Sequence, residues 1–175
     1  MNVRDNAMTA LILGFFASSW FGWAQERPPA AWRSPLIVGA LLSIVVAVAG
    51  AVLAWRNWSA AGSALSEPGA MRRYGIIVGV EFGVAAAGAV GIAVWGRSEY
   101  IAPWICLVVG VHFVPMAPVL KSPSLIALGI LMVAIAVAAA VVSRRTELAP
   151  SAVTGAGAGV ALLGFAIWGA AAAIA

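Results

Sequence analysis

Six long apolar runs limit what this chain can fold into more than any other feature of the sequence. They cover residues 8–24, 35–55, 74–96, 100–120, 123–143 and 150–174. A helix needs about 20 consecutive apolar residues to cross the hydrocarbon core of a bilayer, and each run is close to that length. The sequence therefore predicts an all-α fold: a polytopic transmembrane helix bundle of about six helices, built as a single domain over residues 1–175.

The composition supports a membrane location. Apolar residues make up 63% of the chain and charged residues 9%, whereas charged residues are about 25% of an average soluble domain. The net charge of +4 would also suit a nucleic-acid-binding protein, but the basic residues stand singly or in pairs where apolar runs end. That placement is typical of helix ends that meet lipid head groups. We therefore expect the lipid bilayer as a partner and expect no nucleic acid.

The ends of the runs resemble membrane interfaces, although they do not set the orientation of the chain. With six spans, five basic residues fall on each side of the membrane, so the positive-inside rule selects neither orientation. The tryptophans near span ends are typical of an aromatic belt. These tryptophans are Trp20, Trp23, Trp55, Trp58, Trp95 and Trp104.

The first run has an alternative interpretation as a cleaved signal peptide. Arg4 precedes an apolar stretch, and Gly22 and Ala24 place small residues at the spacing of a cleavage site. Asp5 argues against this, because the leader of a signal peptide is basic.

An internal repeat is a further possibility. Residues 33–35 read Arg-Ser-Pro and residues 121–123 read Lys-Ser-Pro, and the apolar runs that follow end at Arg56 and Arg144, again 88 positions apart. A repeat of three spans would give two inverted three-helix halves, an architecture common among transporters. The alternative interpretation is that any two runs of Val, Ala and Leu resemble each other.

Two ionisable side chains inside the runs are predicted to lie at the same depth. Counted from the side of the membrane that holds the N-terminus (side A), Glu81 lies seven residues beyond Tyr74, or about 10 Å. His112 lies eight residues before Leu120, or about 12 Å from the same side. The short connection between these runs predicts antiparallel neighbours. Glu81 and His112 are therefore candidates for a substrate or proton site, with structural bonding between two helices as the alternative.

Prolines and glycines suggest how these helices are shaped and packed. Pro115 and Pro118 lack amide hydrogens and are predicted to kink or break the fourth helix near His112. Small residues at spacings of four let helix backbones approach closely in membranes. Glu81 is two residues from both Gly79 and Gly83, so it faces the opposite side of the third helix from this glycine stripe. Both sides then have a reason to face protein, which predicts a central position for that helix. The predicted packing glycines are Gly75, Gly79, Gly83, Gly155 and Gly159.

Several kinds of chemistry lack the residues they need. One cysteine, Cys106, and one histidine do not supply the ligands of a zinc or iron–sulfur site within one chain. Phosphate-binding loops, dinucleotide-binding glycine motifs and nucleophile elbows are absent from the sequence. The only lysine, Lys121, lies at a helix end, which excludes a mid-helix Schiff base. We predict no cofactor, no metal and no catalytic residue, and an enzyme is the less favoured class.

The stretch 109–117 reads Val-Gly-Val-His-Phe-Val-Pro-Met-Ala. It resembles a G-x-H-F-x-P-x-A pattern of small bacterial polytopic membrane proteins that have no established activity. The resemblance covers one helix and implies about six helices in a bacterial inner membrane.

Three functions remain open at this point. The leading hypothesis is a small transporter or permeation protein with a polar site at Glu81 and His112, which a cavity reaching Glu81 would favour. The second is a structural or assembly subunit, forming a homo-oligomer or packing against other membrane subunits, which a dry pair and a flat glycine-lined face would favour. The third is a lipid-modifying enzyme with His112 as base, which a lateral opening beside His112 would favour.

Overall fold

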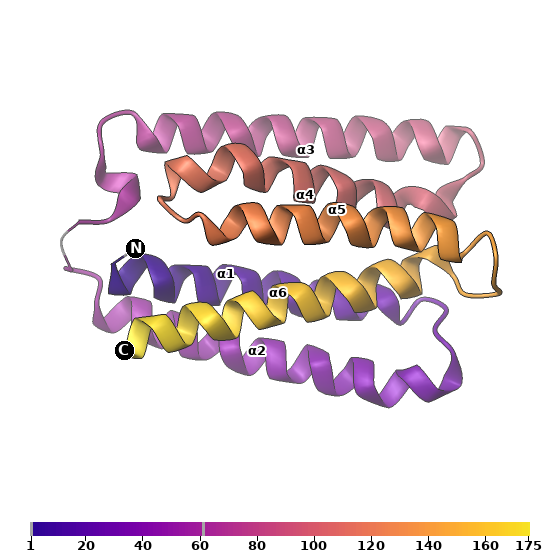
Figure 1. Ribbon diagram of the computed structural model, residues 1–175, viewed down its shortest axis with the longest axis horizontal. Helices are drawn as coiled ribbons and strands as arrows, with labels where there is room; N and C mark the ends of the chain where they lie inside the picture. The colour runs from indigo at the N-terminus through magenta and orange to yellow at the C-terminus, as the bar shows by residue number, and fades with distance from the viewer. Residues whose placement is uncertain (1, 61) are drawn as a thin grey trace.

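The computed structural model describes residues 2–60 and 62–175, and within this part of the chain six long helices form an all-α bundle (Figure 1). They are α1 (Val3–Ala24), α2 (Arg33–Arg56), α3 (Ala70–Val94), α4 (Ile101–Val119), α5 (Ser124–Val142) and α6 (Pro150–Ile174). Short 3-10 turns lie between them: η1 (Ala30–Trp32), η2 (Ala64–Ser66) and η3 (Ser98–Tyr100). Each long helix has the length and hydropathy to cross a membrane. The protein is thus a multi-pass integral membrane protein.

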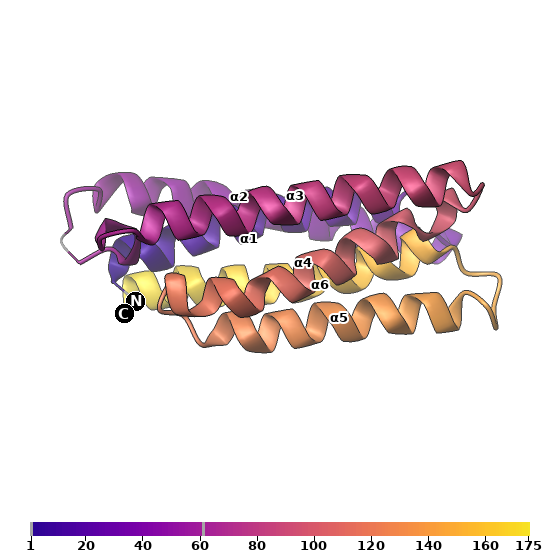
Figure 2. The ribbon, with the colours of Figure 1, turned by 90° about the horizontal axis from the view of Figure 1, so that it is seen from above.

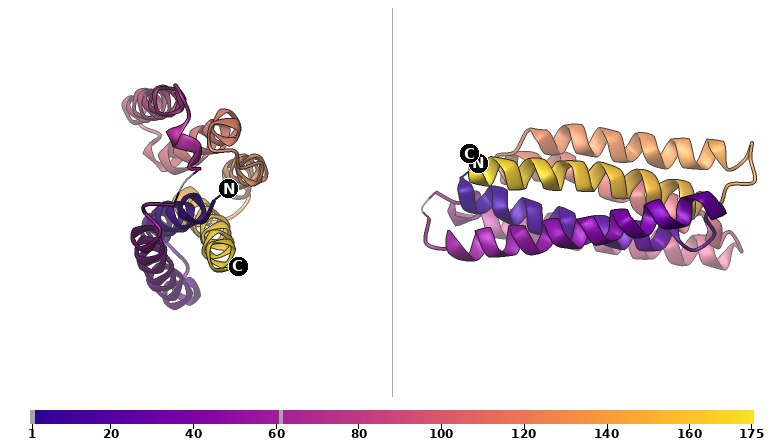
Figure 3. Two further views of the ribbon diagram at one scale, coloured as in Figure 1. Left: turned by 90° about the vertical axis from the view of Figure 1, so that its left-hand side faces the viewer. Right: turned by 90° about the horizontal axis from the view of Figure 1, so that it is seen from below.

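The helices run along one long axis (Figures 1 and 2) and form two groups that are visible in Figure 1. In the first group, α1 packs against both α2 and α6. In the second, α4 packs against both α3 and α5, and α6 joins the groups through contacts with α4 and α5. The end-on view shows α3 set apart from α1, α2 and α6 (Figure 3). Of the residues of α3, Ala70 alone is buried.

Small residues allow the closest contacts in the first group. A Cβ atom added to Gly155 on α6 would lie 2.5 Å from the carbonyl oxygen of Trp20 and 2.6 Å from the amide nitrogen of Ala24, both on α1. One added to Gly159 would lie 2.8 Å from the ring of Phe21. Lipid offers no hydrophobic driving force for helix association, so close packing of this kind stabilises the contact between helices instead. Gly155 and Gly159 therefore lie at the α1–α6 contact.

The glycine stripe on α3 is in a different environment. An added Cβ at Gly75, Gly79 or Gly83 would have no neighbouring atom within 4 Å in the described chain. The central position predicted for this helix is wrong, because α3 is the outermost helix and packs against α4. An apolar helix face is equally compatible with lipid and with protein, so its composition did not determine its neighbours. A packing role for these three glycines stays a prediction about contacts beyond this chain.

The prolines of α4 do not interrupt the helix as predicted. The α4 helix continues through Pro115 and ends one residue after Pro118. Each proline removes a single amide donor, and the next bonds of the ladder persist, since the Leu120 amide donates to the Met116 carbonyl at 3.0 Å. The prediction of a helix break is therefore wrong, and a kink at these prolines stays a prediction.

The α2–α3 connection on side A is tied to the start of α1. The Asp5 carboxylate accepts hydrogen bonds from the Ser63 hydroxyl and from the Ala64 amide, both at 2.8 Å. Lys121, in the α4–α5 turn, forms an ion pair with Glu67 beside η2. These bonds link three segments that are distant in sequence.

The two proposed halves share part of their packing. The contact of α1 with α2 has its counterpart in the contact of α4 with α5. An inverted repeat would also make α3 equivalent to α6, yet α6 is enclosed by four helices and α3 is peripheral. The inverted repeat stays a prediction from the sequence.

Candidate functional site

The structure brings Glu81 of α3 and His112 of α4 together. The Nδ1 atom of His112 lies 3.4 Å from Oε1 of Glu81, and each side chain is 14% exposed. The turn η3 makes α3 and α4 antiparallel neighbours, which places the two residues at one depth (Figure 1). The site therefore joins the two side chains that the sequence placed at equal depth, while their role in moving a substrate or a proton stays a prediction.

A hydrogen bond from His112 to the backbone shows which nitrogen of its ring carries a hydrogen. Nδ1 lies 2.6 Å from the carbonyl oxygen of Val109, one turn earlier in α4. A carbonyl oxygen only accepts hydrogen bonds, so Nδ1 must be the donor. Glu81 Oε1 meets the same hydrogen at longer range. Nε2 is then the ring nitrogen that takes up or releases a proton.

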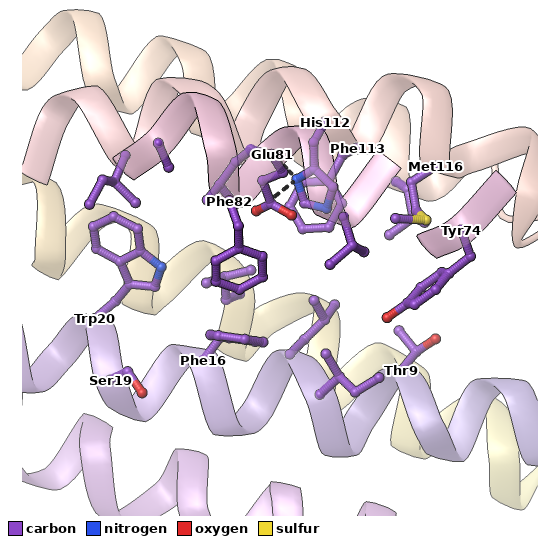
Figure 4. Close-up of a pocket in the computed structure, with 18 of the residues that line it drawn as sticks. Thr9, Phe16, Ser19, Trp20, Tyr74, Glu81, Phe82, His112, Phe113 and Met116 are labelled. Carbon is purple, nitrogen blue, oxygen red and sulfur yellow. Dashed lines mark hydrogen bonds and ion pairs between the residues drawn. The ribbon is translucent and has the colours of Figure 1, made fainter. Parts of the chain in front are cut away.

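Both side chains line a cavity of about 530 Å³ between α1 and α3. The floor is formed by α4, with Leu125 of α5 and Leu162 of α6. Figure 4 shows the Glu81 carboxylate directed into this space, with Phe16 and Trp20 of α1 on the opposite wall. Phe16 is 45% exposed and Phe82 of α3 is 63% exposed. The cavity is therefore a groove that opens sideways between α1 and α3, and we call it the α1–α3 groove.

The surroundings of the pair are much less polar than the sequence hypothesis assumed. Thr9, Ser19 and Tyr74 add three hydroxyls to the walls, and no lysine or arginine lines the groove. Most of the remaining wall is aliphatic or aromatic. The aromatic lining residues are Phe16, Trp20, Trp23, Tyr74, Phe82 and Phe113. A ligand that fills this groove must therefore be largely apolar.

A second cavity lies on the other flank of the α3–α4 contact. It has a volume of about 400 Å³ and is lined by side chains such as Val80 and Val84 of α3 and Trp104 of α4. Glu81 and His112 line this cavity too. Glu81 and His112 thus lie between two cavities and line both of them, so neither side chain is surrounded by close-packed protein.

Three of the tryptophans near span ends also have contacts inside the protein. Trp20 is 5% exposed and lines the groove with Trp23, while Trp104 packs against Gly88 and donates a hydrogen bond to the Ala85 carbonyl at 3.2 Å. The belt concerns depth in the membrane and stays a prediction for all six tryptophans. A signal for the groove was present in the sequence, because Phe16, Trp20 and Trp23 follow at spacings of four and three and so share one helix face.

Among the described residues, no group of three or more His, Cys, Asp or Glu side chains could hold a metal ion. Cys106 is buried outside the groove, and its thiol donates to the Met132 carbonyl at 3.3 Å. No protein-family model, curated protein or solved structure matches the chain. The resemblance of residues 109–117 to bacterial membrane proteins stays a prediction.

Proposed function

We propose that the protein is a small transporter or permeation protein whose substrate enters the α1–α3 groove and meets Glu81 and His112. The observation that carries the proposal is the 3.4 Å contact of these side chains inside a cavity of about 530 Å³. Ionisable groups within membrane spans are costly and usually mark substrate or proton pathways. A pair that served only to join two helices would need no cavity on either side.

The same pair offers a way to couple the substrate to protons. A carboxylate without a partner is costly in an apolar environment, so Glu81 requires a positive charge nearby or a proton of its own. His112 beside it exchanges a proton at Nε2. Either a proton on the pair or a positively charged group in the groove can therefore balance the charge of the Glu81 carboxylate. Binding of the charged group then favours release of the proton, and binding of the proton favours release of the charged group.

The test is a flux measurement in proteoliposomes that contain a trapped pH indicator. An organic cation, an organic anion and a neutral compound of similar size are each added outside under an imposed pH gradient. We expect at least one compound to collapse the gradient faster than in protein-free liposomes. Glu81→Gln should abolish this effect. Glu99→Gln, the same change at an exposed carboxylate in η3, should retain it.

Two results would contradict the proposal. The first is that no compound moves faster than in liposomes without protein. The second is that Glu81→Gln supports the same flux as the unaltered chain.

The groove geometry favours transport over a lipid-modifying enzyme, although the groove opens sideways beside His112. A nucleophilic mechanism needs a hydroxyl or thiol within hydrogen-bonding reach of the base. The Thr9 hydroxyl donates to the Asp5 carbonyl at 2.9 Å, and the Ser19 hydroxyl donates to the Phe15 carbonyl. Among the described residues, His112 makes its hydrogen bond to backbone rather than to such a group.

An assembly subunit is a second candidate, and the α3 stripe supports it. A Cβ atom added at Gly75, Gly79 or Gly83 would meet no atom within 4 Å in the described chain, and small residues at this spacing are typical of contacts between membrane helices. Under this candidate, Gly79→Leu would dissociate an oligomer or a complex that chemical cross-linking captures in native membranes. Unchanged cross-linking would exclude a role of this face in assembly.

A further inference from the structure

The charges that line the α1–α3 groove select the sign of its ligand. Glu81 is the one acidic side chain of the lining, and no lysine or arginine accompanies it. The titratable groups that face it are His112 from α4 and Tyr74 from its own helix, whereas α1 and α6 contribute none to the lining. An anion in this groove would meet a carboxylate without a fixed positive partner. A cation would meet an opposite charge.

The aromatic wall suits the same kind of ligand. Phe16, Trp20 and Trp23 line the groove from α1. Phe82 projects from α3 beside Glu81 (Figure 4). The rings of Trp20 and Trp23 are stacked, with centroids 5.4 Å apart. The faces of aromatic rings attract cations, and the attraction strengthens where water is excluded. The cavity volume of about 530 Å³ lies within the range of about 300–1,000 Å³ that holds small organic ligands.

We propose that the α1–α3 groove binds a monovalent lipophilic cation, an ammonium or phosphonium with aryl or alkyl substituents, in exchange for one proton held by Glu81 and His112. This inference rests on the proposed function and names its substrate class. One positive charge enters the site and one proton leaves to water, so the net charge of the site does not change. The apolar substituents contact the aromatic and aliphatic walls, and the charge lies at Glu81.

A lipid head group carries similar chemistry but fits the groove less well. A choline lipid combines a quaternary ammonium with a phosphate, and the phosphate would need a cationic partner that the groove lining lacks. Glu81 also lies eleven residues beyond Ala70, where α3 begins, or about 16 Å along the helix, which is deep for a head group. A free cation is therefore the favoured occupant.

The experiment compares two probes of matched shape and opposite charge on the purified, full-length protein. Tetraphenylphosphonium and tetraphenylborate are titrated in maltoside detergent, with binding followed by tryptophan fluorescence and by calorimetry. We expect tetraphenylphosphonium to bind at least about tenfold more tightly than tetraphenylborate. Glu81→Gln should weaken tetraphenylphosphonium binding by about 10- to 100-fold, since it removes one partner of a partly buried charge pair. Glu99→Gln should leave the affinity unchanged.

The pH dependence tests the exchange itself. In the pH range where the empty site is protonated, each cation must displace one proton. The Kd for tetraphenylphosphonium should then rise by up to about tenfold for each pH unit of acidification. Calorimetry in buffers of different ionisation enthalpy should then give one proton released for each cation bound. A Kd that is independent of pH over the whole stable range of the protein would overturn the exchange.

A matched pair of phenylalanines tests the aromatic wall without altering a charge. Phe16 lines the groove, whereas Phe15 is exposed on the same helix outside it. Phe16→Leu should weaken tetraphenylphosphonium binding by about 2- to 30-fold, the range expected for one cation–aromatic contact. Phe15 touches the ligand only through the edge of the Phe16 ring, so Phe15→Leu should have a clearly smaller effect. Equal effects of the two variants would overturn the assignment of the cation to this wall.

Other outcomes separate the substrate class from the transport function. Equal binding of tetraphenylborate, or full tetraphenylphosphonium affinity in Glu81→Gln, overturns the cation class. Displacement of tetraphenylphosphonium by equimolar dodecylphosphocholine would identify a lipid as the occupant and overturn the free cation. Flux of an anion or a neutral compound alone overturns the class but leaves transport standing. Glu81-dependent cation binding without any flux supports the class and overturns transport.

Discussion

A single added methyl group distinguishes the enclosed helix α6 from the peripheral helix α3. Gly155→Ala places a Cβ atom 2.5 Å from the Trp20 carbonyl oxygen, whereas ordinary van der Waals contact begins at 3.4 Å. The difference, 3.4 − 2.5 = 0.9 Å, is the overlap that a shift of α1 against α6 would have to relieve. The obstructing atoms are backbone, so no side-chain rotation relieves the overlap. Overpacking of this kind costs about 1–3 kcal/mol.

The matched change on α3 has the opposite expectation. Gly79→Ala meets no atom within 4 Å, and replacing a glycine within a helix by alanine gains about 0.5–1 kcal/mol. The gain from replacing glycine by alanine is common to both variants, because both positions lie within helices. The two variants should therefore differ by the overpacking cost alone, about 1–3 kcal/mol in the free energy of unfolding. The change in Gly155→Ala also moves the helix that carries Trp20, so ligand binding should weaken in parallel.

The assay is reversible unfolding in mixed micelles, with dodecyl maltoside titrated by sodium dodecyl sulfate. Circular dichroism and tryptophan fluorescence report the fraction folded, and the shift of the midpoint gives the change in stability. An equal loss in Gly79→Ala, or no loss in Gly155→Ala, would refute the assigned packing of α1, α3 and α6. A penalty for Gly79→Ala that occurs in bilayers but not in micelles would identify the α3 stripe as an intermolecular contact.

Three further changes test other parts of the structure. Gly88→Leu would overlap the Trp104 ring and displace α3 from α4, so tetraphenylphosphonium affinity should fall although the site residues are intact; undiminished affinity would contradict this coupling. Cys106 is 0% exposed, so a maleimide should label it only after unfolding, and rapid labelling of the folded protein would contradict its burial. Asp5→Ala removes the acceptor of the Ala64 amide, so proteolysis of the α2–α3 connection should be about tenfold faster, the equivalent of about one hydrogen bond; an unchanged cleavage rate would show that this anchor is dispensable.

The equal depth of Glu81 and His112 could be predicted because it depends on quantities that the sequence contains, whereas their contact also depends on helix rotation, which it does not. The rise per residue of a helix is constant, so depth follows from counting along each span. A short connection between two spans makes them antiparallel neighbours. These two facts placed the residues at one depth before any packing was known, and the observed 3.4 Å contact agrees with them.

The rotation and position of α3 could not be predicted in the same way. In a soluble helix, polar residues mark the face that turns outward, but the outer face of a membrane helix is apolar as well. The stripe through Gly75, Gly79 and Gly83 was therefore compatible with a protein neighbour and with lipid. The choice depends on how the other helices fill space, and in this bundle α6 takes the enclosed position beside α1.

The apolar character of the groove also escaped the sequence analysis. A tryptophan near the end of a span fits an interfacial belt and a groove wall equally well, and Trp20 and Trp23 were assigned to the belt. Their spacing from Phe16 was the available signal, because three aromatic residues on one helix face indicate a common surface. It is this wall that turns a polar site into one suited to an apolar ligand.

The most direct test of the central claim is whether an apolar reagent reaches the Glu81 carboxyl group through the groove. Dicyclohexylcarbodiimide is apolar and adds to protonated carboxyl groups, and peptide mass spectrometry locates the adduct. We predict one stable adduct at Glu81 that is missing in Glu81→Gln, with a labelling rate that falls when tetraphenylphosphonium is present. No adduct at Glu81 in the folded protein, or labelling that tetraphenylphosphonium does not slow, would contradict the account of the α1–α3 groove as a ligand site.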